Sequence, residues 1–120
     1  MGGKSTDLRV RTKAFALRAM RLVDSLPSGR SCEVIGKQLL RSATSVGANY
    51  RSACRGRSPA EFIAKMGIVE EEADESGYWM ELLVEGELVK RELLADLQAE
   101  AGEIVAMVVA SIRTARANTR

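Results

Sequence analysis

The sequence predicts an all-α fold, an antiparallel up-down-up-down four-helix bundle, and three observations favour it. Apolar residues recur at steps of three and four along most of the chain, which is the period of an amphipathic helix. The 120 residues include only two prolines, Pro27 and Pro59, so long uninterrupted helices are allowed. Hydrophobic residues make up 46% of the chain but aromatic residues only 4%, which suits a helical core better than a β-sandwich.

The first half of the chain predicts two helices after a flexible tail over residues 1–6. The first is expected from about Asp7 to Leu26, with Thr6 as its N-cap. Its inward row comprises Leu8, Phe15, Ala19, Leu22 and Leu26. After the break at residues 26–30, the second helix is expected from about Ser31 to Gly56. Its inward row comprises Ile35, Leu39, Ala43, Val46, Tyr50 and Ala53, and two interior glycines, Gly36 and Gly47, indicate close approach of another backbone.

The second half predicts two further helices. Ser58-Pro59-Ala60-Glu61 is a capping box with proline at the first helical position, so a helix is expected from Pro59 to about Glu85. Its inward row comprises Phe62, Met66, Val69, Ala73, Ser76, Trp79 and Leu83. A last helix is expected from Leu88 or Val89 to Ala115, on a row of Leu94, Leu97, Ala101, Ile104, Val108 and Ser111. The bundle therefore covers residues 7–115, and residues 116–120 are expected to fray.

Charge is divided between the two halves of the sequence. Residues 1–60 carry 12 Lys and Arg against 3 Asp and Glu, whereas residues 61–120 carry 6 against 13. One interpretation is a set of ordinary solvated helix faces. The other is a basic surface for RNA or DNA, whose phosphates bind Lys and Arg. Its candidate residues are Arg9, Arg11, Lys13, Arg18 and Arg21, with Arg51, Arg55 and Arg57 as additions.

The second predicted helix carries a stripe of small polar residues that is a candidate subunit interface. Arg41 in this stripe lies at the same level of the bundle as Glu72 and Glu75 in the third helix, counted from the turn near residue 57. An Arg–Glu network there would fix helix register, and independent solvated charges are the alternative. The residues of this interface or polar network are Gln38, Arg41, Ser45, Asn49, Glu72 and Glu75, with Ser42 and Ser52 in the same stripe.

No catalytic, cofactor or metal site is expected. The chain has no histidine, which removes the usual general base and the usual zinc nitrogen ligand. A carboxylate-only cation site at Glu72 and Glu75 is a minor alternative. Cys32 and Cys54 are too few for a disulfide scaffold and are expected to be reduced. No apolar run is long enough to span a membrane, and no signal core is found, so we expect a cytoplasmic protein.

Two segments resemble a known family. Residues 36–50 (GKQLLRSATSVGANY) are similar to the hallmark segment of bacterial four-helix bundle proteins related to the rRNA intervening-sequence protein. Residues 58–68, 72–75 and 78–83 resemble the third-helix pattern of that family, and residues 14–18 its first helix. The resemblance implies a homo-oligomer, typically a pentamer. It also implies similarity to the accessory variability protein of diversity-generating retroelements, a basic pentamer that binds nucleic acid and a reverse transcriptase.

These observations leave two expected functions. The first is a non-enzymatic, homo-oligomeric interaction or scaffold protein whose main partner is itself. The second is an accessory protein that binds RNA or DNA, in company with a reverse transcriptase, through the basic residues of the first helix. No membrane partner is expected.

Overall fold

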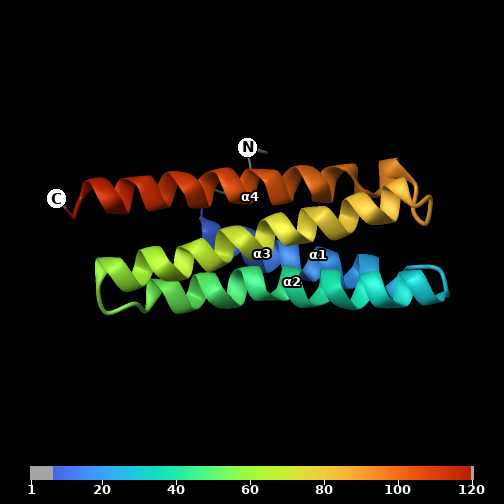
Figure 1. Ribbon diagram of the computed structural model, residues 1–120, viewed down its shortest axis with the longest axis horizontal. Helices are drawn as coiled ribbons and strands as arrows, with labels where there is room; N and C mark the ends of the chain where they lie inside the picture. The colour runs from blue at the N-terminus through green and yellow to red at the C-terminus, as the bar shows by residue number, and fades with distance from the viewer. Residues whose placement is uncertain (1–6, 120) are drawn as a thin grey trace.

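The described part of the protein, residues 7–119, is all-α. In the computed structural model it forms four helices and no strand: α1 (Leu8–Asp24), α2 (Arg30–Cys54), α3 (Pro59–Glu85) and α4 (Arg91–Ala117). The α1–α2 and α3–α4 connections lie at one end of the molecule and the α2–α3 connection lies at the other (Figure 1). The predicted all-α class is confirmed. The expected flexible tail, residues 1–6, and Arg120 lie outside the described residues.

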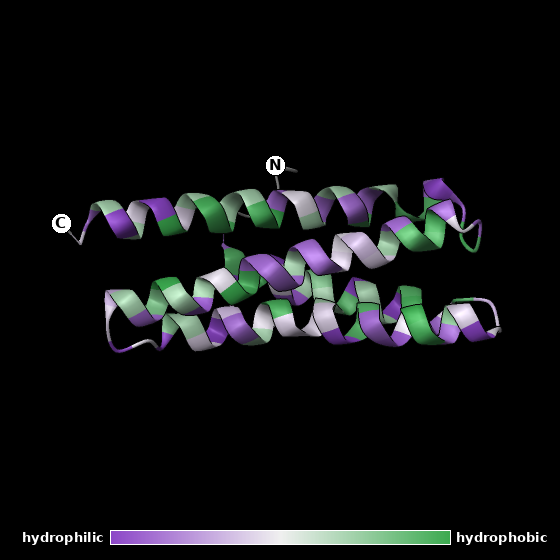
Figure 2. Cartoon of the chain, viewed as in Figure 1, coloured by the Kyte–Doolittle hydropathy of each residue, from purple (hydrophilic) through white to green (hydrophobic). Residues whose placement is uncertain are grey.

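Each helix packs against two others. α2 packs on α1 and α3, while α4 packs on α3 and, less extensively, on α1. The described chain is elongated and flat, with principal extents of 50 × 34 × 20 Å. Hydrophobic and hydrophilic residues alternate as stripes along the helices, as amphipathic packing requires (Figure 2). None of the described helices combines the length and the apolarity needed to cross a bilayer.

The predicted inward rows form most of the core. The largest fully buried apolar side chains are Phe15, Leu39, Val46, Met66, Val69, Met80, Leu83, Leu94, Ile104 and Val108. Two assignments in α3 need correction. Trp79 lies only partly buried at the edge of the core, and Met80, which was absent from the predicted row, is fully buried in its place. The buried row of α3 therefore continues from Ser76 through Met80 to Leu83, again in steps of four and three.

The ends of the helices follow local capping chemistry. Asp7, and not Thr6, is the N-cap of α1, because its carboxylate accepts a hydrogen bond of 2.8 Å from the Arg9 backbone N–H. α1 ends at Asp24, two residues before the expected end. The expected start and end of α3 are confirmed, with the Ser58 hydroxyl accepting from the Glu61 N–H at 3.1 Å.

The α3–α4 connection is longer than predicted. Gly86 caps α3, and Glu87 takes a left-handed backbone with φ of 60°. The N–H groups of Leu88 and Val89 then donate to the carbonyl oxygen of Leu83, which keeps both residues in the turn. α4 consequently begins at Arg91. At its other end the helix runs to Ala117, so Arg116 and Ala117 are helical rather than frayed.

Gly47 allows α1 to lie close to α2. A Cβ atom at this position would lie 3.3 Å from Thr12 Oγ1 and 3.5 Å from the Thr12 backbone carbon. Thr12 is itself buried, with its hydroxyl donating to the Leu8 carbonyl oxygen at 2.7 Å. The predicted close approach of a second backbone is therefore observed at Gly47, and the neighbour is the N-terminal half of α1.

Replacing Gly47 by leucine is expected to destabilise the fold. The side chain would have to displace the Thr12 segment, and overpacking of this kind costs about 1–3 kcal/mol. Gly67→Leu is the matched control, because a Cβ there meets nothing within 4 Å. The control is expected to raise the free energy of unfolding by up to ~1 kcal/mol through helix propensity. Urea denaturation at one fixed protein concentration measures both, and equal effects would contradict the assigned close approach.

Candidate nucleic-acid interface and interhelical charge networks

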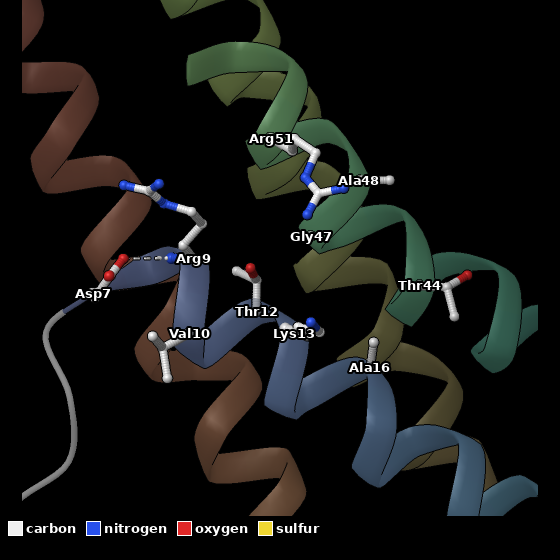
Figure 3. A pocket seen from close by; sticks show the side chains of 10 residues that line it. All are labelled: Asp7, Arg9, Val10, Thr12, Lys13, Ala16, Thr44, Gly47, Ala48 and Arg51. Carbon is white, nitrogen blue, oxygen red and sulfur yellow. Dashed lines mark hydrogen bonds between the residues drawn. The ribbon is translucent and has the colours of Figure 1, made fainter. Parts of the chain in front are cut away.

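An open groove of about 690 Å³ lies between the N-terminal half of α1 and the C-terminal half of α2. Its floor is made of short side chains, including Thr12, Ala16, Thr44, Gly47 and Ala48. Three cations line it, Arg9 and Lys13 from α1 and Arg51 from α2 (Figure 3). The short side chains between the two helices leave the groove open, and the longer side chains of Arg9, Lys13 and Arg51 line it.

The predicted basic residues do not all meet in this groove. Arg9, Lys13 and Arg21 are exposed and Arg18 is half-buried, but only the first two line the groove. Arg51 joins them from α2, as the wider candidate set anticipated, because it lies one helical turn beyond Gly47. Arg55 and Arg57 lie in the α2–α3 turn, at the end of the molecule, and do not line the groove.

Arg11 does not belong to an exposed basic surface, which corrects its predicted role. Its side chain is 10% exposed and spans the α1–α4 contact. The Nε and Nη2 atoms donate to the two carboxylate oxygens of Glu100 at 2.9 and 2.6 Å, and Nη2 also donates to Glu103 at 2.7 Å. Nη1 contacts the sulfur of Met107 at 3.4 Å. This bidentate pairing holds the guanidinium of Arg11 against α4.

The charge state of Arg11 is fixed by these contacts. Hydrogen bonds to Glu100 and then to Glu103 raise the pKa of the guanidinium above its ordinary value, although burial acts in the opposite direction. These contacts therefore favour the protonated, charged form of Arg11. The Arg11–Glu100–Glu103 cluster was not predicted. The only sequence signal was Glu100 on the otherwise apolar row of α4, between Leu97 and Ile104.

Arg41 lies between the two predicted glutamates. Its Nη1 donates to Glu72 Oε1 at 3.4 Å, its Nη2 pairs with Glu75, and its Nε donates to Gln38 Oε1 at 3.3 Å. The Arg41 side chain is half-exposed, so screening keeps the stability gained from these pairs small. Of the two alternatives left open by the sequence, paired charges are the observed arrangement. The guanidinium also lies where a cation bound by Glu72 and Glu75 would have to sit.

The polar stripe of α2 is turned toward α3 of the same chain. The hydroxyls of Ser42 and Ser76 are fully buried and 2.9 Å apart. Near the end of α2, Lys65 Nζ donates to Ser52 Oγ at 2.6 Å. Small polar side chains here allow α2 and α3 to pack closely with their hydroxyls satisfied, because an unpaired buried hydroxyl would be costly. Much of the stripe therefore serves the α2–α3 contact.

The edge of this stripe stays accessible. Ser45 and Asn49 are half-buried and bond along their own helix, Ser45 Oγ to the Arg41 carbonyl oxygen and Asn49 Nδ2 to the Ser45 carbonyl oxygen. Trp79 extends the network from α3, because its indole N–H donates to Glu75 Oε2 at 3.1 Å. The exposed rim between α2 and α3 is thus an ordered row of polar groups with one amphipathic ring.

Tyr50 lies near the basic groove without adding charge to it. Burial, together with a hydrogen bond to Cys54, raises the pKa of the phenol to about 12. The hydroxyl is therefore neutral at physiological pH. Among the described residues that line the groove, Asp7 is the acidic one, and its carboxylate caps α1.

A second, smaller groove of about 180 Å³ lies between α3 and α4, and the sequence did not reveal it. Two carboxylates line it, Asp74 and Glu81, together with Ala73, Gly77, Gln98, Ala101, Gly102 and Val105. The α3–α4 groove is thus acidic and floored by small residues. Within residues 7–119, no group of three or more Cys, Asp and Glu side chains has the geometry to hold a metal ion.

Comparisons with known proteins identify a family and a solved structure that are similar to this four-helix chain. A family model described as "23S rRNA-intervening sequence protein" matches residues 6–110. A crystal structure of a protein with unknown function from the S23 ribosomal protein family of Bacteroides thetaiotaomicron is similar, with a TM-score of 0.81 and 34% sequence identity. The similarity covers 88% of this chain and 98% of that one. Among functionally curated proteins, none matches the chain.

Removing Arg11 alone is expected to destabilise the protein strongly. Arg11→Met removes the guanidinium that pairs with the buried Glu100 carboxylate, and breaking a buried pair in this way costs about 3–5 kcal/mol. The matched control is the double variant Arg11→Met with Glu100→Met, which replaces the pair by apolar side chains. It is expected to recover most of the loss. Urea denaturation measures both, and a loss below about 1 kcal/mol for the single variant would show that the cluster is not a stabilising contact.

Proposed function

The chain belongs to the 23S rRNA-intervening sequence protein family, and on that premise we propose that it is a non-enzymatic, self-associating scaffold protein of the cytoplasm. Its unit is an antiparallel up-down-up-down bundle, which the alternation of the connections between the two ends supports (Figure 1). Copies of this unit assemble into a homo-oligomer, for which the family resemblance suggests a pentamer.

This proposal is supported by the many charged side chains that are not neutralised by ion pairs within the described chain. α1 and α2 hold an excess of Arg and Lys, and α3 an excess of Glu and Asp. Among residues 7–119, the ion pairs between these blocks involve one cation, Arg41, which pairs with Glu72 and Glu75, whereas Arg11 pairs with Glu100 and Glu103 of α4. Opposite blocks that remain on different faces attract between copies of the same chain. Exposed apolar side chains on α1, α2, α3 and α4 add the burial that a stable contact needs, among them Val10, Val34, Ile68 and Leu93.

The oligomeric state tests the proposal directly. We expect the wild-type chain to elute and scatter as a homo-oligomer in multi-angle light scattering, and to show the same mass under native mass spectrometry. Because the association combines charge attraction with apolar burial, raising the salt concentration is expected to weaken it in part. A monomer at every concentration and salt tested would refute self-association.

A second candidate function is supported by the α1–α2 groove. Three cations around a floor of short side chains fit the phosphodiester backbone of RNA or DNA, since phosphate contacts need only Lys and Arg within reach. The absence of projecting aromatic side chains among the lining residues favours backbone contact over base reading. In this role the protein would act as an accessory to an enzyme that works on nucleic acid. The family resemblance suggests a reverse transcriptase as that enzyme.

A salt series with charge-neutralised variants tests nucleic-acid binding. Arg9→Gln and Arg51→Gln are each expected to weaken binding to RNA and DNA across sequences, and to reduce the salt slope by about one. Arg30→Gln is the control, because Arg30 is exposed at the far end of α2 and does not line the groove. Fluorescence anisotropy at low salt measures the affinities. No binding by the wild-type protein at low salt would remove this function.

A further inference from the structure

We propose that α1 of one copy lies in the acidic α3–α4 groove of a second copy, so that the oligomer is built head to tail. This inference rests on the proposed self-association and names the two surfaces that form it. The outer face of α1 supplies large apolar side chains and cations. The α3–α4 groove supplies a floor of small residues and a rim with two carboxylates.

The outer face of α1 is unusual for a helix in water. Val10, Leu17 and Met20 are 55, 42 and 43% exposed, and they fall on the side of α1 that faces away from the core residues Phe15 and Ala19. Lys13 and Arg21 lie among them on the same face, by helical spacing. Asp24, at the C-terminal end of α1, is the acidic side chain on this face, and the charged side chains on it before Asp24 are basic. A row of exposed apolar side chains interleaved with basic ones is the pattern of a helix that packs against an oppositely charged partner.

The α3–α4 groove has the complementary shape. A Cβ atom added at Gly77 or Gly102 would meet nothing within 4 Å, so no contact within the described chain requires glycine there. Glycine in a helix interior costs roughly 1 kcal/mol relative to alanine, so both positions sacrifice helix stability. The exposed face of α4 beside Gly102 continues with Ala95, Ala99, Ala106 and Ala110. This face allows the backbone of another helix to approach closely, with its larger side chains filling the groove.

The charges of the groove select the occupant. Asp74 and Glu81 line it, and among residues 7–119 neither has a side-chain ion-pair partner in the structure. Two carboxylates repel the phosphates of a nucleic acid and attract the cations of α1. The basic face and the acidic groove belong to the same chain, so every copy offers both surfaces and needs no other protein to satisfy them.

The two surfaces belong to different parts of the molecule. α1 packs on α2 and α4, whereas the groove lies between α3 and α4, so one copy cannot place its own outer α1 face in its own groove. A contact between two different patches is heterologous, and it closes into a ring when the rotation per copy allows it. Arg9 and Arg51 line the α1–α2 groove and are outside the residues assigned to this contact, whereas Val10 and Lys13 belong to both surfaces.

Charge reversal tests the assignment. Lys13→Glu with Arg21→Glu reverses the α1 face, and Asp74→Arg with Glu81→Arg reverses the groove. Either pair alone is expected to weaken association at least tenfold in sedimentation velocity, because like charges then face each other. All four substitutions in one chain restore opposite charges and are expected to restore the oligomer. Arg57→Glu with Glu85→Arg is the control for reversal outside both surfaces and is expected to leave association unchanged.

A steric pair keeps the test independent of charge and of folding. Gly102→Leu fills the groove and is expected to yield a folded monomer, with helical circular dichroism retained because leucine favours the helix. Gly67→Leu is its match, since Gly67 is equally open but lies outside the groove, and it is expected to remain oligomeric. A wild-type monomer would refute self-association itself. A wild-type oligomer that none of these substitutions weakens would refute this interface alone.

Discussion

A buried guanidinium joins the first helix to the last. α1 has 17 residues and α4 has 27, and their contact is the least extensive of the four interhelical contacts. Arg11 spans that contact: its Nε and Nη2 donate to Glu100, Nη2 also donates to Glu103, and Nη1 lies beside the sulfur of Met107. A buried ion pair adds little net stability when compared with apolar side chains of the same size, but its geometry permits only one register. The position of α1 along α4 therefore depends on this cluster.

The position of α1 determines both the α1–α2 groove and the outer face of α1. Arg11 points inward toward α4, so Lys13 and Leu17 on the opposite side of α1 point outward. On the third side, Thr12 rests against Gly47 and sets the distance between α1 and α2. The α1–α2 groove and the outer face of α1 are thus two results of one helix placement. A slip of α1 by one residue would bury a different side chain at the Glu100 position and rotate the cations away from the groove.

The two ion-pair networks differ in how many of their charged groups remain exposed at the surface. The Arg11 cluster removes one cation and a buried carboxylate from solvent, and therefore subtracts from the basic surface. The Arg41 network is half-exposed, and it orders Gln38, Glu72, Glu75 and the Trp79 indole along the rim between α2 and α3. An ordered polar rim of this kind loses little side-chain entropy on contact with a partner. Most of the opposite charges on α1 and α3 remain outside these networks, which is why association between copies is the function that the charge distribution favours.

The sequence by itself determined the helices and most of the core, because helical period and capping are local properties. The ends of α3 follow directly from Ser58, Pro59 and Gly86, and the buried rows from steps of three and four. The pairing level of Arg41 with Glu72 and Glu75 also followed from counting residues to a short turn. Only the tertiary structure decided what lies between helices far apart in sequence. The partner of Arg11 is 89 residues away, the neighbour of Gly47 is Thr12, and the α3–α4 groove is lined by two glycines from different helices, Gly77 and Gly102. Each of these depends on the rotation of one helix about its axis against another, and a periodic pattern that covers a wide face does not fix that angle.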